Sequence, residues 1–279
     1  MRRRLPKTSL IITTYNWEAA LDVVLASVRR QSRLPDEVLV ADDGSGPPTG
    51  ALIARHAETF PIPLHHVWHE DLGFRLTAIR NRAVAAARGP YVIMLDGDMV
   101  LHPEFVASHL AFAEPGFYVQ AGRVLLREAV TRRILAGEQI RIRPWTGGVG
   151  NRINAISSPI LARLYRGPRG PFRRTRGGNM GYWLDDVRRI NGYDEECVGW
   201  GAEDVEFAVR LQNSGVRRRN LKFGGIAFHL HHATRPAHTE PANLERYQRA
   251  VRDRLTWCSN GLDKYAKPVT TPSRGALHG

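Results

Sequence analysis

Paired cysteines and long apolar runs are both missing from this sequence of 279 residues. The two cysteines, Cys197 and Cys258, are too few for a disulfide framework and lack the spacing of metal ligands, which favours a reducing compartment. No run reaches about 18 apolar residues, so we expect no transmembrane helix. Residues 1–7 are rich in arginine and contain no apolar core of a signal peptide. These absences predict a cytoplasmic protein, either soluble or attached peripherally to the inner face of a membrane.

Acidic residues are also scarce, since 27 Asp and Glu stand against 40 Lys and Arg. The net charge of +13 favours anionic partners, but it does not choose among nucleotides, nucleic acids and an anionic membrane surface. The hydrophobic content of 43% is enough for a full core. The length suits one large α/β domain or two coupled lobes.

The first 100 residues alternate between apolar runs and amphipathic stretches. We expect strands at 9–14, 37–41, 64–68 and 91–95, and helices at 17–31, 49–60 and 75–88. This alternation is typical of βαβ units in a parallel sheet, whose strands end along one edge. That edge would gather the polar groups that follow the strands: Thr14-Tyr15, Asp42-Asp43 and Asp96-Gly97-Asp98.

The pattern weakens after residue 100. We expect helices at 103–113 and 205–213 and strands at 117–126 and 224–230. Between Arg163 and Arg176, six arginines are interleaved with glycine and proline, which indicates a loop. This loop is either solvated or a lid that meets phosphates or an acidic acceptor. We expect a nucleotide-binding half at 1–130, an acceptor-binding and catalytic half at 131–262, and a flexible tail at 263–279.

Residues 91–99 read Tyr-Val-Ile-Met-Leu-Asp-Gly-Asp-Met, an apolar strand that runs into two carboxylates. Open α/β sheets bind their ligands at the carboxyl ends of strands. Like charges this close repel unless a cation lies between them or they face different partners, and carboxylate oxygens suit Mg²⁺ or Mn²⁺. Asp96 and Asp98 therefore indicate a metal–nucleotide site, the alternative being two solvated turn carboxylates.

A family resemblance rests on these motifs. Ile-Ile-Thr-Thr-Tyr-Asn, Asp-Asp-Gly-Ser and Leu-Asp-Gly-Asp-Met resemble the nucleotide-binding half of the family 2 glycosyltransferases. Gly-Gly-Asn-Met-Gly and Gly-Trp-Gly-Ala-Glu-Asp resemble the acceptor half of galactosyl- and N-acetylgalactosaminyltransferases, including bacterial chondroitin-type polymerases. The resemblance implies the GT-A fold, with a mostly parallel nucleotide-binding sheet flanked by helices and a coupled acceptor-binding lobe. It also implies inverting transfer of a sugar from a nucleotide diphosphate to an acceptor hydroxyl.

In that family the Asp-x-Asp motif (DXD motif) holds Mn²⁺ or Mg²⁺, which implies that Asp98 is a metal ligand and that Asp96 faces the ribose. The resemblance also implies a histidine ligand downstream of the Trp-Gly motif. His229 and His231 would share one face of a strand, because side chains alternate, and His232 would point away. We expect His231 as the ligand, with His229 as its rival.

The nucleotide contacts follow from the same resemblance. Thr14 and Tyr15 would lie against the base, and Asp42 and Asp43 would contact the uracil and the ribose. The alternative for Asp42 and Asp43 is a plain Asp-Gly turn. Arg80 would touch the nucleotide sugar, or else it is solvated on its helix.

An inverting transfer needs one base, and the resemblance implies that Asp204 is that base and that Glu203 binds the acceptor hydroxyl. A helix N-terminus would stabilise their ionised forms, and the alternative is an ordinary helix cap. The resemblance places four further residues near the donor sugar or the acceptor: Gly178, Asn179, Trp200 and Gly201.

The sequence thus predicts a metal-dependent inverting glycosyltransferase that uses a UDP-sugar and a saccharide or glycolipid acceptor, in bacterial surface polysaccharide synthesis. It has no Gln-x-x-Arg-Trp motif and one catalytic set, which favours single additions. The alternatives are a nucleotidyltransferase of similar fold and a basic, non-enzymatic protein that binds nucleic acid or a membrane surface. We expect no nucleic-acid partner, because the acidic motifs would repel phosphate without a metal.

Overall fold

The computed structural model describes residues 5–138, 140–167, 175, 177–233 and 239–265. In chain order the strands are β1 (Thr8–Thr14), β2 (Glu37–Asp42), β3 (Leu64–Trp68), β4 (Tyr91–Asp96), β5 (Met99–Leu101), β6 (Phe117–Ala121), β7 (Arg123–Leu126), β8 (Val149–Gly150), β9 (Asn179–Trp183), β10 (Arg217–Leu221) and β11 (Ala227–His229). The α-helices are α1 (Glu18–Arg29), α2 (Pro47–Ala57), α3 (Leu76–Ala86), α4 (Phe105–Phe112), α5 (Glu128–Leu135), α6 (Pro159–Leu164), α7 (Leu184–Arg189), α8 (Glu203–Asn213) and α9 (Pro241–Arg252), with 3₁₀ turns η1 (Arg152–Ala155) and η3 (Leu262–Tyr265).

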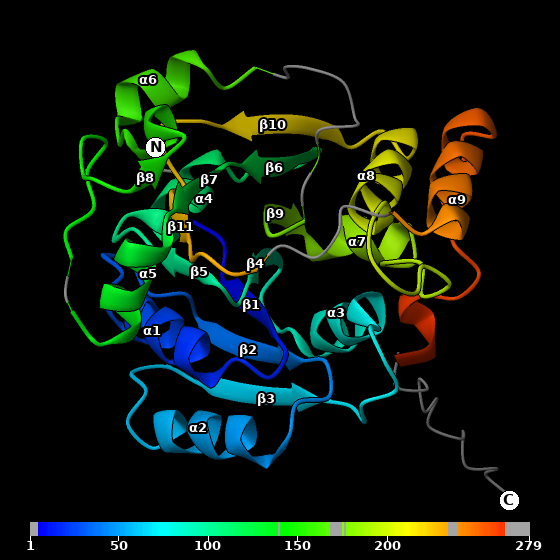
Figure 1. Cartoon of the computed structure of the whole chain (residues 1–279). Coiled ribbons are helices and arrows are strands. Elements are labelled where there is room, and N and C mark those ends of the chain that lie inside the picture. The colour runs from blue at the N-terminus through cyan, green and yellow to red at the C-terminus, as the bar shows by residue number, and fades with distance from the viewer. Residues whose placement is uncertain (1–4, 139, 168–174, 176, 234–238, 266–279) are drawn as a thin grey trace, which may run out of the picture.

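A seven-stranded sheet in the order β10-β6-β9-β4-β1-β2-β3 forms the centre of the molecule (Figure 1). Its strands are parallel except for β9, which is antiparallel to both β4 and β6. The four strands and three helices expected in the first 100 residues are confirmed with small shifts at their ends. The strand expected at 117–126 is instead two strands, β6 and β7, in different sheets.

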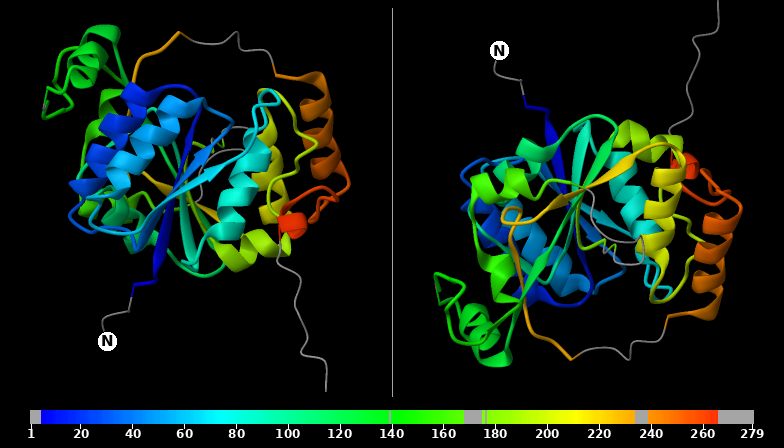
Figure 2. Two further views of the ribbon diagram at one scale, coloured as in Figure 1. Left: turned by 90° about the horizontal axis from the view of Figure 1, so that it is seen from below. Right: turned by 90° about the horizontal axis from the view of Figure 1, so that it is seen from above.

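Two apolar cores cover the two faces of this sheet, because its buried strands present apolar side chains on both sides. One core packs the sheet against α1, α2, α4 and α5, and the other packs it against α3, α7 and α8. Figure 2 shows the same separation of the first two helices from α3, α8 and α9. Helix α9 packs against α8 on the outside.

The sheet is strongly twisted, as strands of L-residues are. In Figure 1 the arrowheads of β3 and β10 point to opposite sides, although the pairings make these two edge strands parallel. The carboxyl ends of β1, β2 and β4 lie together on adjacent strands, as expected.

A second sheet of four short strands, in the order β5-β11-β7-β8, lies beside this edge. Its strand β5 starts directly after Asp98, and β11 pairs with it so that His229 lies opposite Met99. This pairing brings the histidine-rich segment to the Asp-x-Asp turn. Among the described residues, no helix is both long enough and apolar enough to span a membrane.

Candidate active site

Arg80 joins three carboxylates from two segments, the end of β4 and the start of α8, at the centre of the site. Its guanidinium lies 2.8 Å from Asp204 Oδ1, 3.4 Å from Asp96 Oδ1 and 3.8 Å from Glu203 Oε1. The residue is 1% exposed, and its guanidinium lies over the ring of Tyr193. The solvated alternative for Arg80 is therefore wrong. A buried guanidinium is stable only when carboxylates pair with it, and these carboxylates are stabilised in turn by its positive charge.

Two glycines allow the chain to approach these carboxylates closely. A Cβ on Gly177 would lie 1.9 Å from Asp204 Oδ1, and one on Gly178 would lie 1.9 Å from Asp96 Oδ2. The Gly177 amide donates to Asp204 Oδ2 at 2.6 Å. A Cβ at either position would displace the carboxylate that it meets, so glycine keeps Asp204 and Asp96 in their present positions.

Glu203 and Asp204 begin α8, directly after Ala202 in the left-handed region with a φ of 67°. Burial and the charge of Asp204 raise the pKa of Glu203 to about 7, against the opposing effect of Arg80. Burial and the neighbouring carboxylates Asp98 and Asp204 raise the pKa of Asp96 to about 6, again against Arg80. The site therefore crowds more acidic groups together than one arginine neutralises.

We expect the raised pKa of Glu203 to make Glu203→Gln progressively stabilising as the pH rises. A carboxyl whose folded pKa lies above its unfolded value of 4.5 holds a proton that the unfolded chain has lost, so its contribution falls between about pH 4.5 and 7. The free energy of unfolding of the variant, measured by urea denaturation, should gain roughly 1–3 kcal/mol on that of the wild type between pH 5 and 8. A difference that does not change with pH would contradict this assignment.

Asp98, His229 and His232 form a candidate metal centre. Asp98 Oδ2 lies 3.3 Å from His229 Nε2 and 3.2 Å from His232 Nε2. These are the three residues among those described whose ligand atoms gather closely enough for one ion. Asp98 Oδ1 is buried and has no hydrogen-bond partner within the described residues, which fits a carboxylate that binds a cation. Burial lowers the pKa of His229, which favours the neutral imidazole that a metal needs.

The expected arrangement of the histidines is wrong in one respect. His232, not His231, lies beside Asp98. Strand β11 ends at His229, and the Leu230 amide then bonds the carbonyl of Asp98 at 2.9 Å, so the alternation of side chains stops there. The amide of His231 bonds Thr131 Oγ1 instead, and nothing in this geometry supports His231 as a ligand.

The predicted nucleotide residues lie at the ends of β1 and β2. Thr14 is buried, whereas Tyr15 is 44% exposed and donates to Asp71 Oδ2. Asp42 and Asp43 are buried and hold the surrounding turn. Asp42 accepts a hydrogen bond from the Ser45 amide and contacts His66. Asp43 accepts one from the Arg75 amide and contacts His69. These contacts are those of a structural turn, so the turn alternative is not excluded and the role of the pair toward a nucleotide stays a prediction.

Asn179 pairs with Leu95 beside Asp96, but its side chain is turned into the protein. Its amide donates to the carbonyls of Gly122 and Gly225, and its oxygen faces His109 Nε2 at 2.9 Å. Because all these groups are committed inside the fold, the expectation that Asn179 lies near a sugar is not supported by its geometry. Its neighbour Gly178 does lie at the site, against Asp96.

Trp200 is 43% exposed on the loop that leads into α8, and Gly201 follows it with a φ of 98°. The sequence pattern did not single out the support for this loop, which comes from Asn243 at the start of α9. The buried Asn243 amide donates to the carbonyls of Val198 and Gly201, each at 3.1 Å.

We expect Asn243→Ala to destabilise the fold by about 1–3 kcal/mol, because the carbonyls of Val198 and the buried Gly201 both lose their donor. Urea denaturation measures this loss. Gln248→Ala, an exposed change on the same helix, is the control and should leave stability nearly unchanged. Equal stability of the two variants would show that Asn243 does not hold the loop.

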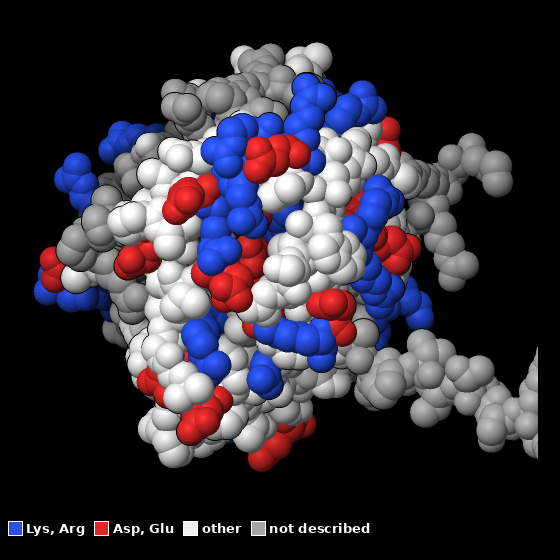
Figure 3. All heavy atoms as spheres, turned by 90° about the vertical axis from the view of Figure 1, so that its right-hand side faces the viewer, with Lys and Arg blue, Asp and Glu red and all other residues white. Residues whose placement is uncertain are grey.

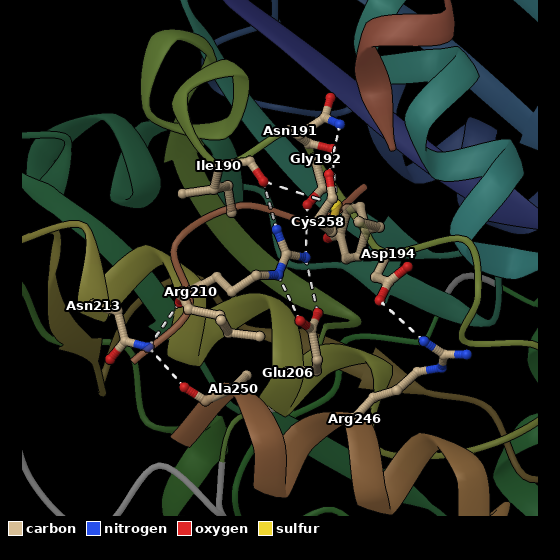
Figure 4. A network of polar contacts seen from close by, with 12 residues as sticks. Ile190, Asn191, Gly192, Asp194, Glu206, Arg210, Asn213, Arg246, Ala250 and Cys258 are labelled. Carbon is tan, nitrogen blue, oxygen red and sulfur yellow. Dashed lines mark hydrogen bonds and ion pairs between the residues drawn. The ribbon is translucent and has the colours of Figure 1, made fainter. Parts of the chain in front are cut away.

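A second buried network fixes the middle of α8 (Figure 4). Arg210 is fully buried, and its guanidinium bonds both carboxylate oxygens of Glu206 at 2.5 and 2.8 Å. It also donates to the carbonyls of Ile190 and Gly192 at 2.6 and 2.8 Å. These bonds tie α8, the helix that begins with Glu203 and Asp204, to the segment at Ile190 and Gly192.

Arg123, at the start of β7, was not predicted from the sequence. Burial raises the pKa of Asp96, and the positive charge of Arg123 opposes that rise weakly. Burial lowers the pKa of His229, and the same charge adds to that lowering. Arg123 therefore adds positive charge beside the candidate metal centre. No motif marks this residue, because only the pairing of β7 with β11 brings it there.

Comparisons with known proteins identify the family and the fold of this chain. The family described as "Glycosyl transferase family 2" matches residues 9–172, and that described as "N-terminal domain of galactosyltransferase" matches residues 160–233. Chondroitin synthase of Escherichia coli is 30% identical over 79% of this chain and 34% of its own length. Validoxylamine A glucosyltransferase of Streptomyces hygroscopicus subsp. limoneus is 28% identical over 76% of this chain and 49% of its own length. The chain thus spans between a third and a half of these relatives.

Solved structures are similar in fold. The structure of GalNAc-T7 with UDP, GalNAc and Mn²⁺ has a TM-score of 0.63 and 16% identity, covering 90% of this chain and 48% of that one. The mannosyltransferase PcManGT from Pyrobaculum calidifontis in complex with GDP-Man and Mn²⁺ has a TM-score of 0.59 and 20% identity, covering 90% and 65%. The fold is the GT-A-like α/β fold that the motifs predict. Because the first family match covers more than half of its residues, this chain belongs to glycosyl transferase family 2.

Proposed function

We propose that this chain is a metal-dependent inverting glycosyltransferase, which moves a sugar from a UDP-sugar to a hydroxyl of a saccharide or glycolipid acceptor. The observation that carries the proposal is that two groups of side chains gather at the Asp-x-Asp turn. Asp98 lies with His229 and His232, and Asp96 is joined through Arg80 to Asp204. Relatives named chondroitin synthase and validoxylamine A glucosyltransferase support sugar transfer.

The three clustered side chains would hold a divalent ion. Two imidazoles beside one carboxylate favour Mn²⁺ over Mg²⁺, because Mg²⁺ prefers oxygen ligands in octahedral geometry. A bound ion would neutralise the charge that grows on the diphosphate leaving group, which is worth several kcal/mol. Neighbours solved with Mn²⁺ support the class of ion.

On the opposite side, Asp204 would take the proton of the attacking acceptor hydroxyl. Its oxygens are oriented by the Arg80 guanidinium and by the Gly177 amide, so the carboxylate needs no rearrangement to act as a base. Glu203 stands beside it on the first turn of α8, where its carboxyl can bind the same hydroxyl. Residues 1–130 would then supply the nucleotide site and residues 131–262 the acceptor side.

The basic surface does not by itself favour another function. Figure 3 shows one face on which Lys and Arg side chains lie among Asp and Glu side chains. Arg246, for example, pairs with Asp194 and Glu196. Peripheral attachment to an anionic membrane, expected from the net charge, stays a prediction that co-sedimentation with anionic vesicles tests.

Turnover across a panel of nucleotide sugars tests the proposed function. With Mn²⁺ we expect hydrolysis or transfer from at least one UDP-sugar, its loss in EDTA and its return on adding Mn²⁺. Release of pyrophosphate from a nucleoside triphosphate would instead identify a nucleotidyltransferase. Steeply salt-dependent DNA binding that ignores EDTA would identify a basic nucleic-acid-binding protein.

A further inference from the structure

His232 is the more exposed of the two histidines in the candidate metal centre. Its side chain is 38% exposed, against 16% for that of His229. The backbone before it is fixed, because the two preceding amides bond the Asp98 carbonyl and Thr131 Oγ1. The rotation of the imidazole is not fixed by these bonds, and its contact with Asp98 gives way to metal bonds when an ion is held. The ring therefore needs a neighbour that is not itself a ligand.

Trp17, in the loop between β1 and α1, is in contact with this imidazole. Its ring centre lies 5.7 Å from that of His232, and the two ring planes meet at 81°. This is the edge-to-face arrangement that aromatic rings prefer, with ring centres about 4.5–7 Å apart. The Nε2 atom of the same imidazole lies 3.2 Å from Asp98 Oδ2, so the contact leaves the ligand atom directed at the metal centre.

The backbone that carries Trp17 is fixed on both sides. Before it, the Asn16 amide donates to Ser45 Oγ at 2.9 Å, and Asn16 Oδ1 accepts the Gly46 amide at 3.0 Å. After it, the Leu21 amide donates to the Trp17 carbonyl at 3.1 Å as α1 begins. The indole is partly buried and packs against the core beneath α1. A ring held in this way can restrain the imidazole that lies against it.

We propose that Trp17 is a positioning residue of the metal centre, whose indole holds the His232 imidazole in the orientation that a divalent ion needs. A half-exposed side chain loses rotational freedom when it becomes a ligand, and a ring that is already oriented loses less. Side chains that orient metal ligands in this way raise the affinity for the metal. The inference rests on the proposed function, because it requires the metal centre of Asp98, and it adds a residue that contacts no substrate.

Trp17→Leu tests this role through the dependence of UDP affinity on Mn²⁺. UDP is titrated into the full chain by calorimetry, once with Mn²⁺ below saturation and once in EDTA, and the readout is the ratio of the two affinities. We expect the ratio to fall about three- to tenfold, the range that one aromatic pair supports, while the affinity in EDTA stays unchanged. Trp17→Phe keeps a ring at this position and should keep most of the ratio.

Two further variants make the comparison independent of any one substitution. Trp17→Met fills the space with a flexible apolar chain and should lower the ratio as Trp17→Leu does, so the test does not depend on the folding of a single variant. Trp257→Leu, the same change at a half-exposed tryptophan after α9, is the matched control and should leave the ratio unchanged. An unchanged ratio in both Trp17→Leu and Trp17→Met would overturn the proposal.

A double-mutant cycle with His232→Ala distinguishes a positioning role from general packing. If the indole acts through the imidazole, Trp17→Leu should have no further effect on the ratio once His232 is alanine. An equal fall in both backgrounds would show that Trp17 only supports the fold, which would overturn the proposal. A wild-type chain that binds UDP equally in Mn²⁺ and in EDTA would instead overturn the metal centre of the proposed function, so the two proposals fail on different measurements.

Discussion

Asp204→Asn should lower sugar transfer by about 10²–10⁴-fold while UDP binding stays intact. The amide cannot accept the acceptor proton, but it has nearly the shape of the carboxylate and can still accept one of the bonds from Arg80 and Gly177. The loss should therefore fall on kcat. Initial rates with the active UDP-sugar, together with UDP affinity by calorimetry, measure both quantities.

Glu203→Gln is the matched control for this variant, because it changes the adjacent acidic residue in the same helical turn. Burial raises the pKa of Glu203 to about 7, so a neutral amide imitates the form that is already half populated at neutral pH. We expect a smaller loss of rate than in Asp204→Asn. Retained turnover in Asp204→Asn would remove Asp204 from the role of base.

The second large effect is expected at the metal side, where Asp98→Ala should weaken Mn²⁺-dependent UDP binding by about 100-fold or more. Asp98 lies within contact distance of both histidines, so its loss removes the negative charge that holds the cluster together. UDP titrations with Mn²⁺ and with EDTA separate this effect from general damage, since affinity in EDTA should not differ between variant and wild type. An unchanged affinity for UDP in the presence of Mn²⁺ would show that Asp98 is not a metal ligand.

His232→Ala and His231→Ala form a matched pair for the same measurement. They change adjacent residues of the same type, of which only His232 contacts Asp98. We expect a loss of affinity in the first variant and little change in the second. The opposite order would restore the sequence-based expectation for His231.

The fold could be predicted because its signals are local. Each strand of the first half is an apolar run, each helix has its own periodicity, and short βαβ connections limit how they assemble. The position of the Asp-x-Asp turn could also be predicted locally, because the apolar run before it marks the strand, and β4 ends at Asp96 in the structure.

Errors arose where a position depends on a distant segment. The alternation argument for His231 assumed that the strand at 224–230 continues, but β11 pairs with β5 over three residues only and then bends around Asp98. Asn179 was expected near the donor sugar or the acceptor, yet it begins β9, which inserts between β4 and β6, and its side chain turns into the protein. The burial of Arg80 depends on Asp204, 124 residues away in the chain. None of these pairings leaves a mark in the local sequence.

A crystal structure with UDP and Mn²⁺ tests the central claim most directly. We predict one ion, identified by its anomalous signal, with bonds of about 2.0–2.3 Å to Asp98, His229 and His232 and to oxygens of the diphosphate. Asp204 should lie on the far side of the site from that ion. An ion bound without any of these histidines, or UDP bound with no ion at Asp98, would contradict the account.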